Sequence, residues 1–347
     1  MTHRRRIEVN STIVIQLHSL EQRKEDKPME ETIVYLNGAF VPESQAKVSV
    51  LDSGFNAGDG VYDVTRTFRH KPFRLREHTE RLFRSLQYTR IDCGMSLEDM
   101  EKTTLEVLEH NKKLLRDNED CALWQVVSRG VRSMRGNRVS GRATVTVYPV
   151  IVNFPEFASF YVEGAPLVIP ATRRIPPQCL ESKAKITNKM NHNMAAFEAK
   201  QADPRAIPLM LDIDGNLSET SAHNCFLVIE GKLCTPSDRN VLGGITKAAM
   251  FELAKQLGVE VVEGNYTPFD LYTAEEAFLA STSPTFVPIK TVNGLQIGKG
   301  APGPITLRLI GAWNQMVGVD IVDQALSHLD KAERDRLMTL WQSKKAA

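Results

Sequence analysis

Runs of β-branched residues alternate with amphipathic helical patterns along most of the chain. Residues 142–152, for example, are mostly Val, Thr and Ile, as in a β-strand. Residues 78–91 instead place Leu82 and Leu86 near one helical face, with charged residues on the other. This alternation constrains the fold more than any other feature. It predicts an α/β or α+β architecture in two units of comparable size.

Short turn signals mark where strands reverse and where helices begin. Asn37 and Gly38 lie between two apolar runs, a strong signal for a β-hairpin. Glu230 and Gly231 are expected at the turn of a second hairpin. Ser96, with acidic residues directly after it, is expected to cap a helix.

These patterns divide the chain into five segments. The N-terminal stretch is highly charged and is expected to be a solvated extension. Proline, phenylalanine and glycine interrupt the regular pattern near the middle of the chain, which predicts a linker there. We expect an extension at 1–31, a smaller α+β domain at 32–152, an interdomain linker at 153–166, a larger domain at 167–324 and an exposed helical tail at 325–347.

Composition argues against several classes of protein. The 347 residues are 42% hydrophobic and 24% charged, with a formal net charge of +1, so affinity for nucleic acid or an anionic membrane is not expected. No window approaches the roughly 20 apolar residues of a membrane-spanning helix, and residues 1–20 lack a secretory signal pattern. The five cysteines are scattered without a C-x-x-C pair. This favours a reducing compartment, and the expected location is the cytoplasm.

A lysine-rich segment at 181–200 contains the first candidates for chemistry. Lysine side chains are mostly exposed in proteins, so Lys183, Lys185 and Lys189 can be ordinary surface charges. Alternatively, one of them lies partly desolvated at the end of a strand and forms an imine with a carbonyl compound. Periodicity alone does not choose among the three.

Two further features follow this segment. Glu219 lies in an otherwise apolar stretch, where a carboxylate is either a surface or capping group or the buried partner of a cation. Gly243 and Gly244 precede a predicted helix, and the free N–H groups of a helix N-terminus can bind an anion. A Gly-Gly turn alone is weak evidence, because most such turns bind nothing.

Taken together, residues 219–247 resemble the signature of class IV aminotransferases. Every signature position matches: Glu219, Ser221, Asn224, Cys225, Phe226, Leu233, Thr235, Leu242, Gly244, Ile245 and Lys247. The resemblance continues in order and spacing from Tyr35 to about Val319. Within this family, the chain is similar to branched-chain, D-amino acid and R-selective amine transaminases.

The resemblance implies a fold, a cofactor and an activity. The family has two α/β domains of fold type IV, like D-amino acid aminotransferase, with pyridoxal 5′-phosphate (PLP) in the cleft between them. Its members are homodimers in which the partner chain contributes to each site. The implied activity is amino-group transfer between an amino donor and a 2-oxo acid, by a ping-pong route through pyridoxamine phosphate.

The resemblance also assigns catalytic roles. Lys185, twelve residues before Phe197, corresponds to the lysine that holds PLP as a Schiff base and then moves the substrate proton. Lys183 and Lys189 remain surface or supporting charges. Glu219 corresponds to the glutamate that keeps the pyridine nitrogen protonated.

The phosphate of PLP needs several donors, and the resemblance supplies them. Arg81 matches the phosphate-binding arginine of the family. The backbone N–H groups of Ile245 and Thr246 are expected to form the helix-terminus cradle, and Thr282 matches a hydroxyl donor on the far side. Ser281, beside it, is expected to contact cofactor or substrate.

Fewer residues can be assigned to the substrate. Tyr62 matches an aromatic position that lines the pocket in relatives, and Arg66 matches a position that arginine occupies in branched-chain enzymes. The tyrosine that those enzymes carry shortly after the catalytic lysine is Met190 here, so the donor class stays open. His192 and His223 lack the spacing of metal ligands, and no metal is expected.

An arginine-rich loop is the candidate for binding the substrate carboxylate. It contains Arg129, Arg132, Arg135 and Arg138, which could equally be solvated loop residues. The R-G-x-x-x-x-R-G spacing that ends at Gly136 resembles R-selective amine transaminases. It makes Arg135 the expected carboxylate contact.

Two other functions remain open. A lyase of the aminodeoxychorismate lyase type would use the same lysine and cofactor but eliminate pyruvate. A non-catalytic binding protein on this scaffold would be expected to have lost Lys185 or Glu219, and both are present.

Overall fold

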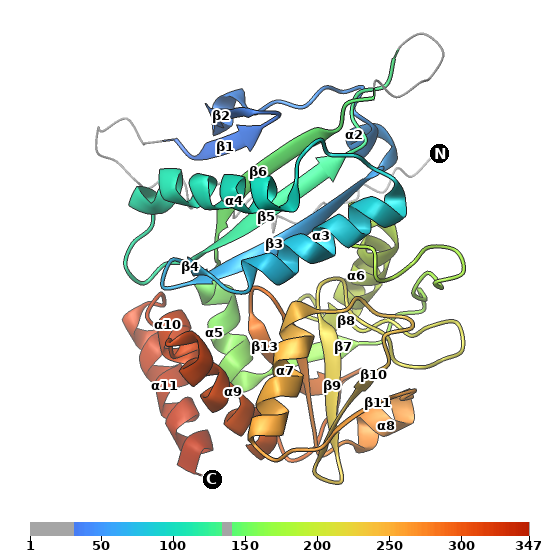
Figure 1. The fold of residues 1–347 in the computed structure, drawn as a ribbon. Helices are drawn as coiled ribbons and strands as arrows, with labels where there is room; N and C mark the ends of the chain where they lie inside the picture. Colours follow the sequence, from blue (N-terminus) through green and yellow to red (C-terminus); the bar gives the residue numbers. More distant parts are fainter. Residues whose placement is uncertain (1–30, 134–140, 347) are drawn as a thin grey trace, which may run out of the picture. The chain divides into compact units, whose positions relative to one another are not determined.

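The computed structural model describes residues 31–133 and 141–346. The expected extension at 1–31 lies outside these ranges except for its last residue, and so does Arg135. Contacts join Thr32–Ala347 into one compact unit, which contains two β-sheets (Figure 1).

The first sheet has six strands, and every paired neighbour in it is antiparallel. Its spatial order is β2-β1-β6-β5-β3-β4. The strands are β1 (Ile33–Leu36), β2 (Ala39–Pro42), β3 (Gly60–Phe68), β4 (Lys71–Pro72), β5 (Cys121–Ser128) and β6 (Thr144–Ile151). Asn37 and Gly38 both adopt positive φ at the β1–β2 turn, which confirms the first predicted hairpin.

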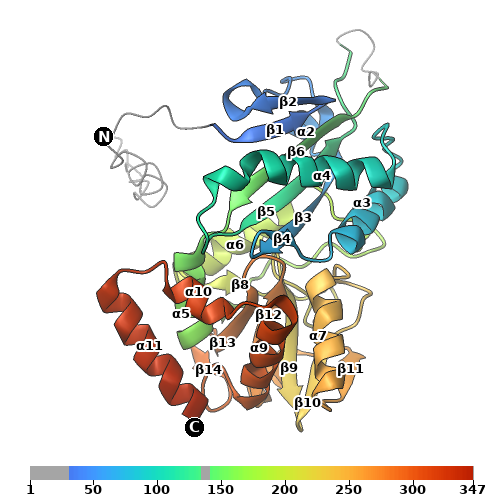
Figure 2. The same ribbon diagram turned by 60° about the vertical axis from the view of Figure 1, so that its left-hand side comes forward.

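Two long helices cover one face of this sheet, α3 (Leu75–Thr89) and α4 (Leu97–Asn111) (Figures 1 and 2). Ser96 and Asp99 form a reciprocal capping box at the start of α4, as predicted. Leu123 and Val127 of β5 pack into the apolar core shared with these helices. Because side chains alternate along a strand, Trp124 faces the opposite side of the sheet.

The second sheet has eight strands in the order β11-β10-β9-β12-β13-β7-β8, with β14 paired to β13. The strands are β7 (Ala165–Val168), β8 (Ile207–Pro208), β9 (Asn224–Ile229), β10 (Lys232–Pro236), β11 (Val261–Gly264), β12 (Glu276–Ser281), β13 (Thr285–Val292) and β14 (Leu295–Gln296). Glu230 and Gly231 connect β9 to β10 with positive φ, which confirms the second predicted hairpin.

Helices cover one face of the second sheet and build its larger apolar core. They are α5 (Phe154–Glu163), α7 (Ile245–Gln256), α9 (Pro304–Val317), α10 (Ile321–Leu326) and α11 (Lys331–Ala346). Three further α-helices are α2 (Ser53–Ala57), α6 (Met190–Ala202) and α8 (Pro268–Thr273), and short 3-10 helices lie at Glu43–Gln45 and Lys112–Leu114. The mixed fold with two sheets agrees with the predicted fold class.

Two segment predictions need correction. Residues 153–166, expected as a linker without regular structure, contain α5 and the start of β7, and Tyr161 is fully buried in the core. The predicted boundary after residue 324 falls inside α10. The tail was expected to be exposed, but Leu337 and Trp341 of α11 are buried because they pack against the helices of the second core.

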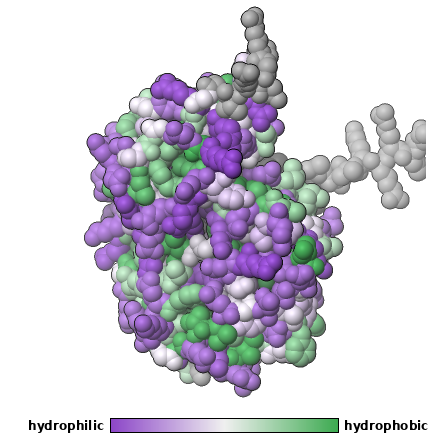
Figure 3. Space-filling view, turned by 45° about the vertical axis from the view of Figure 1, so that its right-hand side comes forward, coloured by the Kyte–Doolittle hydropathy of each residue, from purple (hydrophilic) through white to green (hydrophobic). Residues whose placement is uncertain are grey.

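The surface is mainly polar on the face shown in Figure 3, where apolar residues gather in smaller patches. Among the described residues, no helix combines the length and apolar character needed to cross a membrane.

The packing of α11 can be tested with two neighbouring residues. Trp341 is 2% exposed and Leu340 is 37% exposed. Trp341→Ala should lower the free energy of unfolding by about 3 kcal/mol, because it empties a filled core position. Leu340→Ala should lower it by less than about 1 kcal/mol. Urea denaturation followed by tryptophan fluorescence and circular dichroism measures both, and equal losses would show that α11 is not docked as described.

Candidate active site

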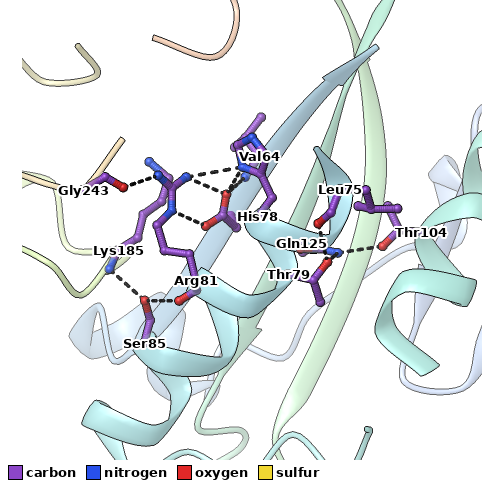
Figure 4. A network of polar contacts seen from close by, with 11 residues as sticks. Val64, Leu75, His78, Thr79, Arg81, Ser85, Thr104, Gln125, Lys185 and Gly243 are labelled. Atoms are coloured by element: carbon purple, nitrogen blue, oxygen red, sulfur yellow. Dashed lines mark hydrogen bonds and ion pairs between the residues drawn. The ribbon is translucent and has the colours of Figure 1, made fainter. Parts of the chain in front are cut away.

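The segment that carries Lys185 lies against β3 and α3. The backbone N–H of Tyr62 donates to the carbonyl of Lys185 at 2.9 Å, and that of Thr187 donates to Gly60 at 2.9 Å. The Lys185 N–H donates to Oγ of Ser85 at 3.1 Å (Figure 4). Lys185 was expected at the end of a strand. It lies instead in an irregular segment whose backbone forms hydrogen bonds with a strand of the first sheet. These bonds fix the position from which its side chain projects.

The amine of Lys185 lies in a poorly hydrated, electropositive position. Its Nζ is 4.5 Å from the centroid of the Tyr62 ring. Burial, with a further contribution from the positive charge of Arg81, lowers the pKa of Lys185 to about 8. The carboxylates of Asp63 and Glu219 oppose this shift without cancelling it. A lowered pKa leaves a larger fraction of the amine neutral at a given pH, and the neutral amine is the nucleophilic form.

Glu219 is buried and held by two donors. Nε of Arg174 donates to one carboxylate oxygen at 3.1 Å, and the backbone N–H of Leu242 donates to the other at 2.9 Å. Arg174 is itself buried. Arg174 cannot be singled out from the sequence, because Arg173 and Arg174 are adjacent and nothing in the pattern separates them. The two donors orient the Glu219 carboxylate within the site.

Asp63 holds Arg81 in place beneath α3. Its buried carboxylate accepts hydrogen bonds from Nε and Nη2 of Arg81, both at 2.8 Å, and from Nδ1 of His78 at 2.7 Å. Burial alone would raise the pKa of the Asp63 carboxyl, but the charge of Arg81 and these hydrogen bonds hold it well below its usual value. The remaining Nη1 of Arg81 donates to the carbonyl of Gly243 at 2.9 Å (Figure 4).

Gly243 places Arg81 beside the N-terminus of α7. This helix starts after Gly244 without a side-chain cap, so its first backbone N–H groups, including those of Ile245 and Thr246, have no acceptor within the helix. A Cβ on Gly244 would lie 2.2 Å from Oδ1 of Asn224, so a side chain there would displace the Asn224 amide that donates to the carbonyl of Leu242. A helix N-terminus beside a guanidinium group has the donors that a phosphate needs.

Two adjoining cavities bring the other predicted residues together. The outer cavity is lined by Tyr62, Lys185, Ser281 and Thr282, among others. The inner cavity is lined by Lys185 and Glu219, and it shares the segment 221–223 with the outer one. Ser281 ends β12, and its buried Oγ has no hydrogen-bond partner among the described residues.

Lys189 and His192 also border the inner cavity. Lys189 was expected to be a surface or supporting charge, and His192 was expected to be a packed or surface histidine. Lys189 is half-buried and His192 is buried. No signal in the pattern of apolar residues distinguishes Lys189 from Lys183, which is exposed.

Two predicted arginines have structural partners instead of open access to the cavities. Arg66 is 1% exposed and lies over the Phe68 and Phe154 rings, and its guanidinium donates to the carbonyl of Ser283. Arg129 forms an ion pair with Asp59 at 2.7 Å and also donates to the backbone carbonyls of Thr89 and Arg90, at the C-terminal end of α3. Arg135, the expected carboxylate contact, lies outside the described residues, as does Arg138.

The residues present fit a phosphorylated aldehyde cofactor. The Lys185 amine supplies the covalent partner, and the buried Glu219 supplies a negative charge in the same cavity. The N-terminal turn of α7, with Arg81 beside it, supplies donors for a phosphate. The unpaired hydroxyl of Ser281 supplies a further polar contact.

Known proteins share both the sequence and the fold. A sequence model described as Amino-transferase class IV matches residues 60–292. A putative branched-chain-amino-acid aminotransferase of Methanocaldococcus jannaschii is 35% identical over 278 residues, which cover 80% of this chain and 93% of the relative. The branched-chain-amino-acid aminotransferase of Escherichia coli K12 is 29% identical and covers 80% of this chain and 90% of its own length.

Solved structures of branched-chain aminotransferases superpose on this fold. The T.th. enzyme complexed with N-(5′-phosphopyridoxyl)-L-glutamate gives a TM-score of 0.74 at 29% identity, covering 83% of this chain and 95% of that one. Another structure of the same enzyme contains pyridoxamine 5′-phosphate. The matched residues 60–292 include Lys185 and every signature residue from Glu219 to Lys247. The chain therefore belongs to the class IV aminotransferase family, and it is a PLP-dependent aminotransferase of fold type IV.

Proposed function

We propose that Lys185 holds PLP and that the donor is an amino acid with a bulky apolar side chain. The observation that carries the first part is the position of the Lys185 amine, poorly hydrated between the Tyr62 ring and the inner cavity that contains Glu219. The second part is supported by the lining of the outer cavity and by the relatives, which are named as branched-chain aminotransferases.

Each remaining residue has a distinct task in this proposal. When bound, PLP supplies an aldehyde that takes up the amino group and a ring that withdraws electrons. Arg81, the N–H groups of Ile245 and Thr246, and the Thr282 hydroxyl bind the phosphate. Glu219, oriented by Arg174, would supply the negative charge that keeps the ring nitrogen protonated. These are the cofactor contacts that the sequence predicted.

Lys185 also moves the proton of the substrate. Its amine lies beside the cavity and would act as the base that takes the proton from the substrate α-carbon and, as the conjugate acid, delivers it to the aldehyde carbon that the cofactor would supply. Ser281, with its unpaired hydroxyl, and Arg135 are the proposed contacts for the substrate carboxylate. The lowered pKa of Lys185 suits this task, because a base works best when its pKa is near the working pH.

An aromatic wall supports the choice of an apolar donor. Tyr62 and Trp124 line the outer cavity and stack with ring centroids 5.4 Å apart and planes 8° apart. Phe157 and Phe160 line the same cavity. An apolar side chain gains free energy by leaving water against such a surface.

We also propose that the enzyme acts as a cytoplasmic homodimer. The α6 residues Met190, Met194 and Phe197 are 65%, 47% and 62% exposed and lie on one side of the helix. A second copy of the chain that covers this stripe would bury it. All five cysteines are free, as expected in a reducing compartment.

The covalent role of Lys185 can be tested directly. Borohydride reduction of the holoenzyme followed by peptide mass spectrometry should locate a pyridoxyl group on Lys185. Lys185→Ala should lose the label and at least about 10³-fold in kcat, because both the anchor and the base are removed. The exposed Lys183 is the matched control, and Lys183→Ala should keep both. A label on any other lysine contradicts the assignment.

The donor class can be tested through Trp124. A screen with L- and D-amino acids and both 1-phenylethylamine enantiomers, against 2-oxoglutarate and pyruvate, should show the highest kcat/KM for a bulky apolar donor. Trp124→Ala should lower kcat/KM for leucine and phenylalanine by about 10- to 100-fold, since their side chains lose a contact surface. Alanine, which does not reach the wall, should change less than about threefold.

Trp124→Phe is the control for this test, because it keeps an aromatic ring and should retain most of the selectivity. Equal losses for large and small donors would contradict the role of the wall. Pyruvate release without an amino acceptor would replace the transferase assignment with the lyase alternative.

A further inference from the structure

Two amines share one face of the Tyr62 ring. Trp124 occupies the other face, since the two rings are stacked almost in parallel. Nζ of Lys185 lies 4.5 Å from the Tyr62 centroid and Nζ of Lys189 lies 5.5 Å from it. Because one face is covered, both amines lie on the remaining one. A second lysine is therefore close to the lysine proposed to hold the cofactor.

The start of α6 brings Lys189 to this place. Lys189 is the residue directly before the helix, and His192 follows one turn later. Residues three apart lie on the same side of a helix, and both of these border the inner cavity. Met190, next to Lys189, points the other way and is 65% exposed. The geometry of the first turn therefore places both Lys189 and His192 at the inner cavity.

The carboxylates near the two amines are already paired. Asp63 binds Arg81 and His78, and Glu219 binds Arg174. Among residues 31–133 and 141–346, no carboxylate lies within the 4.0 Å salt-bridge distance of either lysine. The charges of Lys185 and Lys189 are thus not neutralised by a partner of their own.

The groups that face the amines come from several parts of the chain. They are Tyr62 and Asp63 of β3, His78 and Arg81 of α3, Arg174 and Glu219 from the segments before and after α6, His192 of α6, and His223. Burial, with the charges of Lys189 and Arg174, lowers the pKa of His192 to about 3, so this imidazole is neutral near pH 7. Burial also lowers the pKa of Lys189; Tyr62 and Glu219 oppose this shift without cancelling it, and the charge of Lys185 adds to it.

We propose that Lys189 is a positioning residue whose ammonium group, on the same ring face as Lys185, opposes the protonation of the Lys185 nitrogen and keeps it available as nucleophile and base. This proposal rests on the proposed function of Lys185. Two like charges in one poorly hydrated cavity repel each other, so the pair binds its second proton less readily than the first. The repulsion acts on any positive charge at the Lys185 nitrogen, whether that nitrogen is free or bonded to the cofactor.

The test removes the charge of Lys189 and follows the protonation of Lys185 in two ways. In the holoenzyme, the visible absorbance of the bound cofactor is titrated between about pH 5 and 10. In the protein without cofactor, the pH dependence of Lys185 acylation is measured by mass spectrometry. Lys189→Met should raise both apparent pKa values by about one unit, because loss of a positive neighbour stabilises the protonated form.

Three further variants control for structural effects. Lys189→Arg keeps the charge and should titrate like the natural protein. Lys189→Gln has no charge and should repeat the shift, which keeps the test usable if the Met variant does not fold. Lys183→Met removes an exposed lysine close to Lys185 in the sequence and should cause no shift. A merely structural role of Lys189 would change thermal stability without moving the titrations.

The outcomes separate this proposal from the one on which it rests. If Lys189→Met and Lys189→Gln titrate like Lys183→Met while Lys185 carries the cofactor, the role of Lys189 is overturned. If the borohydride label of the natural protein is not on Lys185, the proposed function itself fails. The acylation measurement does not need the cofactor, so it tests the pairing of the two amines in either case.

Discussion

The ion pair between Asp63 and Arg81 is the interaction on which the site depends. Asp63 projects from β3 and Arg81 from α3, and the pair is buried. Arg81 reaches past it to Gly243, at the entrance to α7 in the second half of the chain. Ser85, one turn further along α3, binds the backbone of Lys185. One helix face therefore contacts both the turn before α7 and the backbone of Lys185, because residues four apart in a helix lie side by side.

Positive charge exceeds negative charge around the cavities. Lys185, Lys189, Arg81 and Arg174 meet only two buried carboxylates, those of Asp63 and Glu219, among the described residues, and each carboxylate is bound to an arginine. Such a site favours anions, which suits a phosphorylated cofactor and substrates that carry carboxylates. It also disfavours extra protons on amines. The same charge distribution thus serves binding and the chemistry of the lysine.

Local sequence signals predicted the parts of the fold that depend on local geometry. The two hairpin turns and the Ser96 cap were found because their residues are required by backbone conformation. The pattern of residues 153–166 does not reveal α5, because Pro155 reads as an interruption although it lies in the first turn of the helix, where a missing N–H costs nothing. The burial of α5 arises from contacts with α10 and β13, which are far away in the sequence.

The sequence predicts candidate site residues only where the chain resembles the family. The roles proposed for Lys185 and Glu219 come from the family resemblance, whereas nothing in the sequence distinguishes Arg174 from Arg173 or Lys189 from Lys183. Arg174 belongs to the site because it binds the carboxylate of Glu219, which lies 45 residues later in the chain. Lys189 lines the inner cavity because of the way the first turn of α6 is oriented in the fold. Both depend on tertiary structure, which spacing along the chain does not reveal.

The buried helix α5 has a mechanical consequence. It is the only covalent connection between the first sheet and the second along the described chain from β6 to β7, and it is packed into the larger core. The hydroxyl of Tyr161 donates to the carbonyl of Pro284, in the turn that follows Ser281 and Thr282. A connection of this kind cannot serve as a flexible hinge. The segment left to join α5 to the first sheet is Val152 and Asn153, directly after β6.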